Sequence, residues 1–245
     1  MSEHTPLRLI DVNTRFGYNP QTGVTTTAED VKRAGRRWGV ERAYTTSLRA
    51  ILYDCDEGNR DTLDLCARDS FFRPAAVVSP TERRPLERVE HVREAGFPLV
   101  RLFPDLHGFA VDGAACRRVL AACARAALPV MLPTDASGPA NLLRALHGAD
   151  GAFILTNNTY GVLGELVALA DPLPNVSVEI GRTFSPDGIA MLVEAFGVER
   201  VLWASDYPTI HVGCSATVLR ASGLSAEEIA MIAFQNAERL LGGLP

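Results

Sequence analysis

The chain has 245 residues with a formal net charge of −5, and 47% of them are hydrophobic and 22% charged, which is typical of a globular protein with a large core. The acidic balance and the lack of a basic run give no electrostatic support to a nucleic-acid partner. Without a signal-peptide pattern or a stretch of about 18 apolar residues, the sequence predicts neither secretion nor a membrane span.

Eight short apolar runs alternate with amphipathic stretches, a pattern that favours βαβ units and a parallel sheet. The runs are rich in Val, Ile, Leu and Phe, as expected for strands that are covered on both faces. The predicted strands are Leu7–Val12, Arg42–Thr46, Phe72–Val78, Leu99–Phe103, Pro129–Leu132, Ala152–Leu155, Val176–Ile180 and Val201–Ala204.

A helix is predicted after each strand. The first has Thr27 as its cap, acidic residues in its first turn and Gly39 as its stop. The others are Asn59–Asp69, Arg83–Ala95, Gly113–Ala127, Ala140–Leu146, Leu163–Ala170, Gly188–Phe196 and Ser225–Leu241. This count predicts a single (β/α)₈ TIM barrel that forms one domain over residues 1–245. An open doubly wound sheet is the alternative, but no Gly-rich phosphate loop follows the first strand.

The cysteines indicate a reducing compartment. The chain has five, none spaced as CxxC: Cys55, Cys66, Cys116, Cys123 and Cys214. We therefore expect free thiols and a cytoplasmic protein. The short loops leave a homo-oligomer possible, in which a neighbouring subunit closes the mouth of the barrel.

Five segments resemble the family 2 amidohydrolases, in the right order and over nearly the whole chain. They are LIDVNTRFG, LVRLFPDLHGF, LPVMLPT, RVLWASDYP and FQNAERLLG, of which the last two are the most specific. The resemblance implies a (β/α)₈ hydrolase or non-oxidative decarboxylase. It also implies one divalent metal, often zinc, held by two His of the first strand, a His after the fifth, sometimes a His after the sixth and an Asp after the eighth.

This sequence departs from that ligand pattern at almost every position. Asn13 and Arg15 replace the first two His, Pro133 the third, and Asn157 or Asn158 the fourth; only Asp206 matches. Asn is a weak ligand and Pro has no side-chain donor. A guanidinium at position 15 would repel a cation by about 4 kcal/mol at 4 Å. We therefore expect no cofactor and no metal-binding residues.

A relocated zinc site is the less favoured alternative for the metal. His107 and His211 are the only His predicted at the carboxyl ends of the strands, and with Asp206 they would supply three ligands. No His-x-His or HExxH spacing supports such a site.

Positive side chains are predicted at the same barrel face. Arg15, Arg101 and Arg182 follow three different strands, and guanidinium groups bind carboxylates or phosphates in a bidentate manner. We expect them to bind a small anionic substrate together with three polar residues, Asn13, Asn157 and Tyr207. The alternative is that the arginines form ion pairs with Asp135, Glu179 or Asp206 at the mouth of the barrel.

Two residues are candidates for acid–base work. Asp206 directly follows the last strand and is the predicted general base, and His107 is the predicted proton donor because its usual pKa lies near neutrality. We therefore expect an enzyme, namely a metal-independent hydrolase or lyase of the decarboxylase or lactonase type that acts on a small carboxylated substrate. A non-catalytic binding or oligomeric scaffold with the same fold is the alternative.

Overall fold

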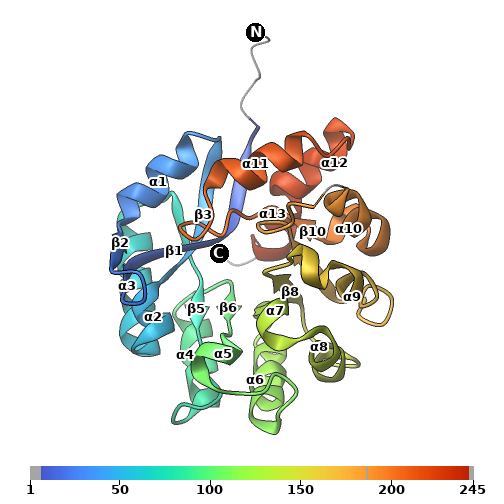
Figure 1. Cartoon of the computed structure of the whole chain (residues 1–245). Coiled ribbons are helices and arrows are strands. Elements are labelled where there is room, and N and C mark those ends of the chain that lie inside the picture. The colour runs from blue at the N-terminus through green and yellow to red at the C-terminus, as the bar shows by residue number, and fades with distance from the viewer. Residues whose placement is uncertain (1–6, 186, 243–245) are drawn as a thin grey trace.

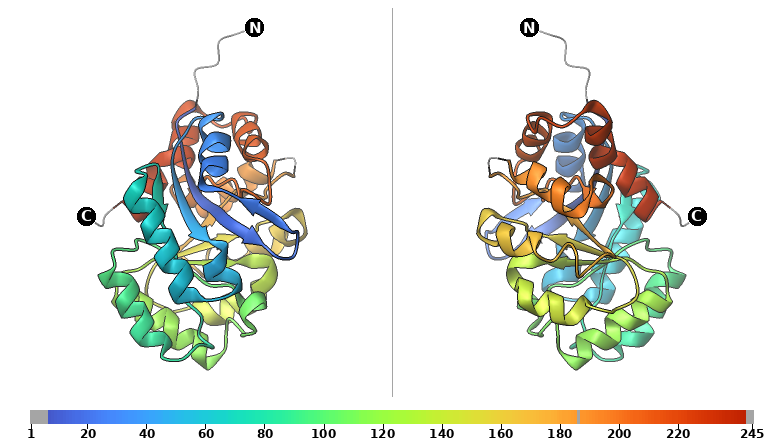
Figure 2. Two further views of the ribbon diagram at one scale, coloured as in Figure 1. Left: turned by 90° about the vertical axis from the view of Figure 1, so that its left-hand side faces the viewer. Right: turned by 90° about the vertical axis from the view of Figure 1, so that its right-hand side faces the viewer.

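The computed structural model describes residues 7–185 and 187–242. Parallel strands form a ring that helices surround, which confirms the predicted (β/α)₈ barrel (Figures 1 and 2). Around the ring the strands are β1 (Leu9–Asn19), β3 (Val40–Ser47), β4 (Phe72–Pro74) with β5 (Ala76–Val77), β6 (Val100–Arg101), β7 (Val130–Pro133), β8 (Phe153–Thr156), β9 (Val176–Glu179) and β10 (Val201–Leu202). A short strand that the sequence did not predict, β2 (Val24–Thr26), pairs antiparallel with the end of β1.

The third strand position joins two hydrogen-bonded sheets, β2-β1-β3-β4 and β10-β9-β8-β7-β6-β5. The predicted run Phe72–Val78 is divided at Ala75, whose N–H donates to Thr45 O, whereas the N–H of Ala76 donates to Leu99 O on the other side. At the opposite seam, between β10 and β1, the backbone N–H of Ser205 donates to Asp11 Oδ1 at 3.0 Å. A carboxylate side chain therefore helps to link the last strand to the first.

The helices match the predicted positions in most units of the barrel. They are α1 (Ala28–Arg36), α2 (Leu48–Leu52), α3 (Cys55–Arg68), α4 (Pro85–Glu94), α5 (Pro104–His107), α6 (Ala114–Arg125), α7 (Thr134–Ser137), α8 (Pro139–Leu146), α9 (Leu163–Val167), α10 (Gly188–Phe196), α11 (Val212–Arg220), α12 (Ala226–Ala230) and α13 (Asn236–Leu241). Short 3₁₀ turns cover Tyr160–Val162 and Val198–Arg200, and a π-helical turn, Met231–Gln235, connects α12 with α13. Thr27 caps α1 in a capping box, as its sequence predicts.

The helix α11 was not predicted, and its sequence explains why. It contains Gly213, a serine, a threonine and two valines, all of which lower the intrinsic preference for a helix. It forms because Val212, Ala216 and Leu219 are buried in the outer core and because His211 Nδ1 accepts a hydrogen bond from the N–H of Gly213 at its first turn. Tertiary packing therefore outweighs local preference here.

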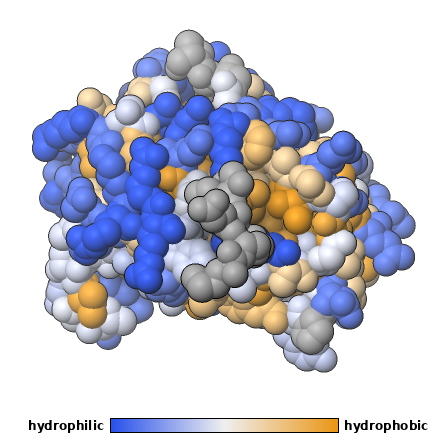
Figure 3. Space-filling model, turned by 90° about the horizontal axis from the view of Figure 1, so that it is seen from above, coloured by the Kyte–Doolittle hydropathy of each residue, from blue (hydrophilic) through white to orange (hydrophobic). Residues whose placement is uncertain are grey.

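Two layers of apolar side chains hold the barrel together. The larger cluster fills the space between strands and helices, and a smaller one, with Ile10, Tyr44 and Met131, fills the inside of the barrel. Ala237 and Leu241 of α13 belong to this interior cluster. The helices present their polar sides outward, so that hydrophilic residues cover much of the face in Figure 3, next to one hydrophobic area.

The structure bears on two further expectations, that the chain has no membrane span and that its cysteines are free. No helix in residues 7–185 and 187–242 is long and apolar enough to cross a membrane. All five cysteines are free, as the sequence predicts.

Candidate functional site

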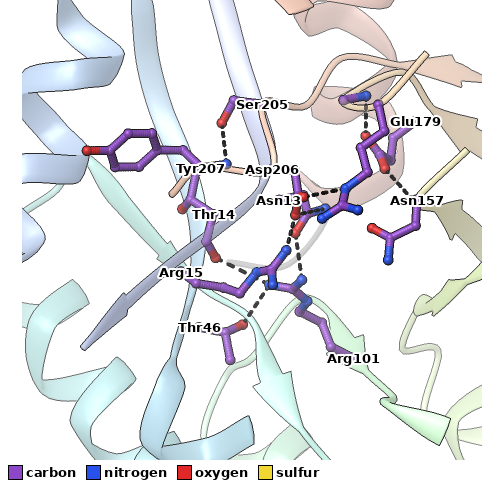
Figure 4. A network of polar contacts seen from close by, with 12 residues as sticks. Asn13, Thr14, Arg15, Thr46, Arg101, Asn157, Glu179, Ser205, Asp206 and Tyr207 are labelled. Carbon is purple, nitrogen blue, oxygen red and sulfur yellow. Dashed lines mark hydrogen bonds and ion pairs between the residues drawn. The ribbon is translucent and has the colours of Figure 1, made fainter. Parts of the chain in front are cut away.

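Polar side chains from both ends of the chain meet at the carboxyl ends of the strands, where barrels of this kind carry their sites (Figure 4). They lie in the strands β1, β3, β6 and β9 or in the segments that follow β8 and β10. The residues that Figure 4 labels in this cluster are Asn13, Thr14, Arg15, Thr46, Arg101, Asn157, Glu179, Ser205, Asp206 and Tyr207.

Asp206 lies at the centre of this cluster and is fully buried. Its backbone has a φ of +58°, a left-handed conformation in which Asp and Asn are over-represented. Oδ2 accepts a hydrogen bond from Arg182 Nε at 2.7 Å, and Oδ1 accepts one from Arg15 Nη2 and a longer one, at 3.4 Å, from Asn13 Nδ2. Both carboxylate oxygens are therefore held by guanidinium groups.

Arg101 is the second centre of the cluster, and it is 3% exposed. Its Nη2 donates to Asn13 Oδ1 at 2.6 Å, and its Nη1 donates to the backbone oxygen of Thr14 and to Thr46 Oγ1. All these acceptors are neutral, and among the described residues Arg101 forms no ion pair and its Nε has no partner. The protein thus buries a cation here without an acidic side chain in contact with it.

The pKa values of the arginines reflect this arrangement. Burial and the positive charge of Arg15 together lower the pKa of Arg101 to about 9. Burial and the charge of Arg182 lower the pKa of Arg15 to about 10. Three guanidinium groups therefore crowd around one ion-paired carboxylate, and an additional negative charge would stabilise them.

Glu179 is a buried acid. From the sequence it is expected only as an alternative ion-pair partner of an arginine. Its Oε2 accepts from the N–H of Gly181 at 2.6 Å and its Oε1 from the N–H of Asn157 at 3.1 Å. A Cβ at position 181 would lie 2.7 Å from Oε2, so glycine permits this close approach. Burial raises the pKa of Glu179 to about 7. Glu179 thereby holds the loops after β8 and β9 together and fixes Asn157, whose φ is +58°.

Asp11 was not among the predicted site residues, although it is the acid of the acid-x-Asn-x-Arg segment on the first strand. It is buried and accepts hydrogen bonds from the N–H and the hydroxyl of Ser205. Burial raises its pKa to about 6. It positions the turn that carries Asp206, one residue further on.

A cavity of about 220 Å³ opens in front of this cluster. Arg15 and Arg101 line it together with Asn157, and apolar residues of β7 and of the segment after β6 form its walls: Leu102, Phe103, Pro104, Leu106, Met131 and Pro133. Two acidic side chains, Asp105 and Asp135, also line it. Asp206 and Arg182 do not line the cavity; Asp206 is held by Arg15, which does.

The structure brings Asn13, Arg15, Arg101, Arg182 and Asp206 together, and places Asn157 at the same cavity. Other predicted residues lie elsewhere. His107 lines a different cavity, with its Nε2 bonded to the backbone oxygen of Ile51 at 2.9 Å. The ring of Tyr207 points away from Asp206 (Figure 4), and burial, with the nearby charge of Asp30, raises its pKa.

His211 caps α11 and packs edge-on against Trp38. It does not combine with His107 and Asp206 into a metal-binding group. The relocated zinc site is therefore not formed by the side chains as the structure places them.

The comparisons with known proteins decide the family. The family model described as amidohydrolase matches residues 54–243, which is most of the chain. The chain belongs to the amidohydrolase family. No protein in a curated collection matches it in sequence.

Solved structures with low sequence identity share the fold of this amidohydrolase over 96% of its chain. A dihydroxybenzoic acid decarboxylase from Polaromonas, with bound manganese and the inhibitor 2-nitroresorcinol, is 13% identical, with a TM-score of 0.77 and 97% of its chain covered. A manganese-bound 5-carboxyvanillate decarboxylase from Novosphingobium aromaticivorans is 14% identical, with a TM-score of 0.73 and 97% covered. A protein provisionally assigned as a 2-pyrone-4,6-dicarboxylic acid hydrolase, from Pseudomonas putida, is 19% identical, with a TM-score of 0.73 and 98% covered.

The expectation that the protein has no cofactor is contradicted by these comparisons. Two of the similar structures hold manganese, and they point to a divalent metal as the cofactor. The expectation of no cofactor depended on the replaced ligand positions alone, whereas these two structures share the whole barrel and hold a metal ion.

The side chains around Asp206, as the structure arranges them, do not fit such an ion. Both oxygens of Asp206 are bonded to guanidinium groups, whose charge opposes a cation. Within residues 7–185 and 187–242, no group of three or more His, Cys, Asp or Glu side chains could hold a metal ion. We therefore derive no chemical step through a metal at Asp206.

Proposed function

We propose that this amidohydrolase is a hydrolase or lyase, of the decarboxylase or lactonase type, that acts on a small carboxylated compound in the cavity beside Arg15 and Arg101. The names of two structurally similar proteins, decarboxylases of dihydroxybenzoic acid and of 5-carboxyvanillate, support a carboxylated substrate. The cavity volume of about 220 Å³ corresponds to about seven water molecules at about 30 Å³ each, which suits a small molecule.

The observation that carries the proposal is the buried guanidinium of Arg101. It is 3% exposed, lines the cavity and forms no ion pair in the described part of the chain. A buried cation without a paired charge is costly, and a substrate carboxylate would offset that cost with charge-assisted hydrogen bonds. The apolar walls from Phe103 to Met131 then hold the remainder of the substrate.

Asp206 is the proposed acid–base group, and Arg15 controls access to it. Arg15 lies between Asp206 and the cavity, because it lines the cavity and also donates to Oδ1. A substrate carboxylate competes with Asp206 for this guanidinium. When Arg15 turns to the substrate, Oδ1 becomes available to take a proton from the water that attacks a lactone, or to take up a proton from water and pass it to the carbon that loses CO₂, while Arg182 continues to hold Oδ2.

The test is a screen of small aliphatic and aromatic carboxylates and lactones with the full chain, in the presence and absence of manganese. Release of CO₂ identifies a lyase, and release of a proton on ring opening identifies a hydrolase. We expect turnover of at least one compound and its loss in Asp206→Asn, with both proteins assayed at a temperature at which circular dichroism shows each to be folded. Turnover that is unchanged in this variant would exclude Asp206 as the acid–base group.

One observation favours a second candidate, a non-catalytic binding protein with the same barrel. Asp206 is fully buried and both of its oxygens are ion-paired, as in a purely structural carboxylate. Calorimetric titration with the same compounds distinguishes the two functions. Binding that depends on Arg101 without turnover of any compound would establish the second function.

A further inference from the structure

The cavity carries unpaired charges of both signs. Arg101 is its unpaired cation, and Asp105 and Asp135 form no ion pair with any residue in the described ranges. Together with Arg15, the ionisable side chains that line it amount to two positive and two negative groups. A ligand with a single negative charge would satisfy only half of this arrangement.

The two kinds of charge come from different parts of the wall. Arg101 ends β6 and is buried against the cluster around Asn13, whereas Asp105 lies in α5 and Asp135 in α7, on the loops that follow β6 and β7. Both aspartates are exposed, so they lie nearer to solvent than Arg101. The apolar residues Phe103 and Met131 line the same cavity.

Asp135 is held in place for such a role. Its Oδ1 accepts hydrogen bonds from the N–H of Ala136 at 2.8 Å and from Asn157 Nδ2 at 3.1 Å. Asn157 is itself fixed by Glu179, through the hydrogen bond between its N–H and Oε1. These contacts leave the negative charge of Asp135 without a cationic partner in the described structure.

We propose that the cavity binds amino carboxylates, with the carboxylate of the ligand on Arg101 and its ammonium group on Asp135 and Asp105. This inference rests on the proposed function for the carboxylate and adds a second recognition group. The apolar walls fit the short carbon chain or ring between the two charges. Such a ligand pairs charges at both ends of the cavity, which a plain carboxylate does not.

The test compares matched ligands by calorimetric titration of the full chain. The probes are ω-amino carboxylates of three to six carbons, the fatty acids of the same length and the corresponding amines. We expect the best amino carboxylate to bind about threefold to tenfold more tightly than its fatty acid, with the amine weakest. Equal binding of the amino carboxylate and the fatty acid would overturn the inference.

Two variants keep this inference separate from the proposed function. Asp135→Asn retains the oxygen that accepts from Asn157 but loses the charge, so it should reduce the preference for the amino group, while the affinity for the fatty acid should not fall because a negative charge leaves the cavity. Asp150→Asn, at an exposed position before β8, is the matched control and should change neither. If no carboxylate binds at all, or if Arg101→Met leaves binding intact, the proposed function fails. If the carboxylates bind but Asp135→Asn keeps the preference, only this inference fails.

Discussion

Arg15 and Asp206 form an ion pair across the seam of the barrel, between the first strand and the turn after the last. The two residues are 191 positions apart in the sequence. The pair joins the same two parts of the chain as the hydrogen bonds between Asp11 and Ser205, so charge and polar contacts both reinforce the seam.

Asp206→Asn should destabilise the protein strongly. The variant removes the carboxylate that is bonded to Arg15 and Arg182 and leaves their two charges facing each other. Breaking a buried pair in this way costs about 3–5 kcal/mol in the free energy of unfolding, measured by urea denaturation. Asn tolerates the left-handed backbone at this position, so strain does not confuse the result. Asp150→Asn serves as the control, and a loss below about 1 kcal/mol for Asp206→Asn would contradict the prediction.

Arg101→Met should affect binding far more than stability. Because Arg101 is buried without an acidic partner, replacing it by an apolar side chain relieves the cost of a desolvated cation while losing its hydrogen bonds. We expect the free energy of unfolding to change by less than about 1.5 kcal/mol, and carboxylate affinity to fall by about tenfold or more. Arg125→Met, at an exposed position on α6, is the control. A large loss of stability with unchanged affinity would show that Arg101 serves only to brace the barrel.

Glu179 should make stability depend on pH. Its pKa is raised from 4.5 to about 7 in the folded protein, so the folded state binds more protons than the unfolded state between these values. Its contribution to stability is therefore fully present below pH 4.5 and is lost as the pH rises to 7, by up to about 3 kcal/mol. In Glu179→Gln this part of the pH dependence should disappear, whatever constant offset the lost hydrogen bond adds. Urea denaturation of both proteins from pH 4 to 8 measures it, and parallel curves would refute the prediction.

Restoring two imidazoles should strengthen metal binding at Asp206. The double variant Asn13→His/Arg15→His removes the guanidinium from Oδ1 and provides two neutral imidazoles, which are stronger ligands for divalent transition metals than an amide oxygen. We expect its affinity for Mn²⁺, measured by calorimetric titration, to exceed that of the wild type by about tenfold or more. Asn13→Ala/Arg15→Ala is the control for the loss of charge alone. Stoichiometric Mn²⁺ in wild-type protein that is lost in Asp206→Asn would show instead that the arginines move aside for the ion.

The sequence was sufficient for the barrel because each strand is a short run of apolar residues with helical periodicity after it. It was also sufficient to place Asp206 and the three arginines at one end, since strand ends converge in this fold. It could not show that Arg15 and Arg182 both bind Asp206 while Arg101 binds none of the acids in the described ranges, because that depends on side-chain directions across the seam. The alternative of ion pairing therefore holds for Arg15 and Arg182, whereas ligand binding by the arginines stays a prediction.

Other features depend on contacts that no local pattern records. Nothing near His107 in the sequence indicates that its Nε2 forms a hydrogen bond with the backbone oxygen of Ile51. Glu179 could have been identified as a buried site residue, because it is an acid at the end of a buried strand and a glycine lies two residues after it. The expectation that no cofactor is present was wrong for a different reason: it depended only on the altered ligand positions, and two structures with the same fold hold manganese.

The contacts of α13 with the interior cluster of the barrel have a consequence for how the protein folds. Ala237 and Leu241 contact the cluster that contains Ile10 and Leu202, so a nascent chain that has all eight strands still has an incomplete centre. Such contacts join distant parts of the sequence, which slows folding and leaves apolar surface exposed in the intermediates. We therefore expect the barrel to be completed only after synthesis has passed residue 241, and chains that end before α13 to aggregate or to need chaperones.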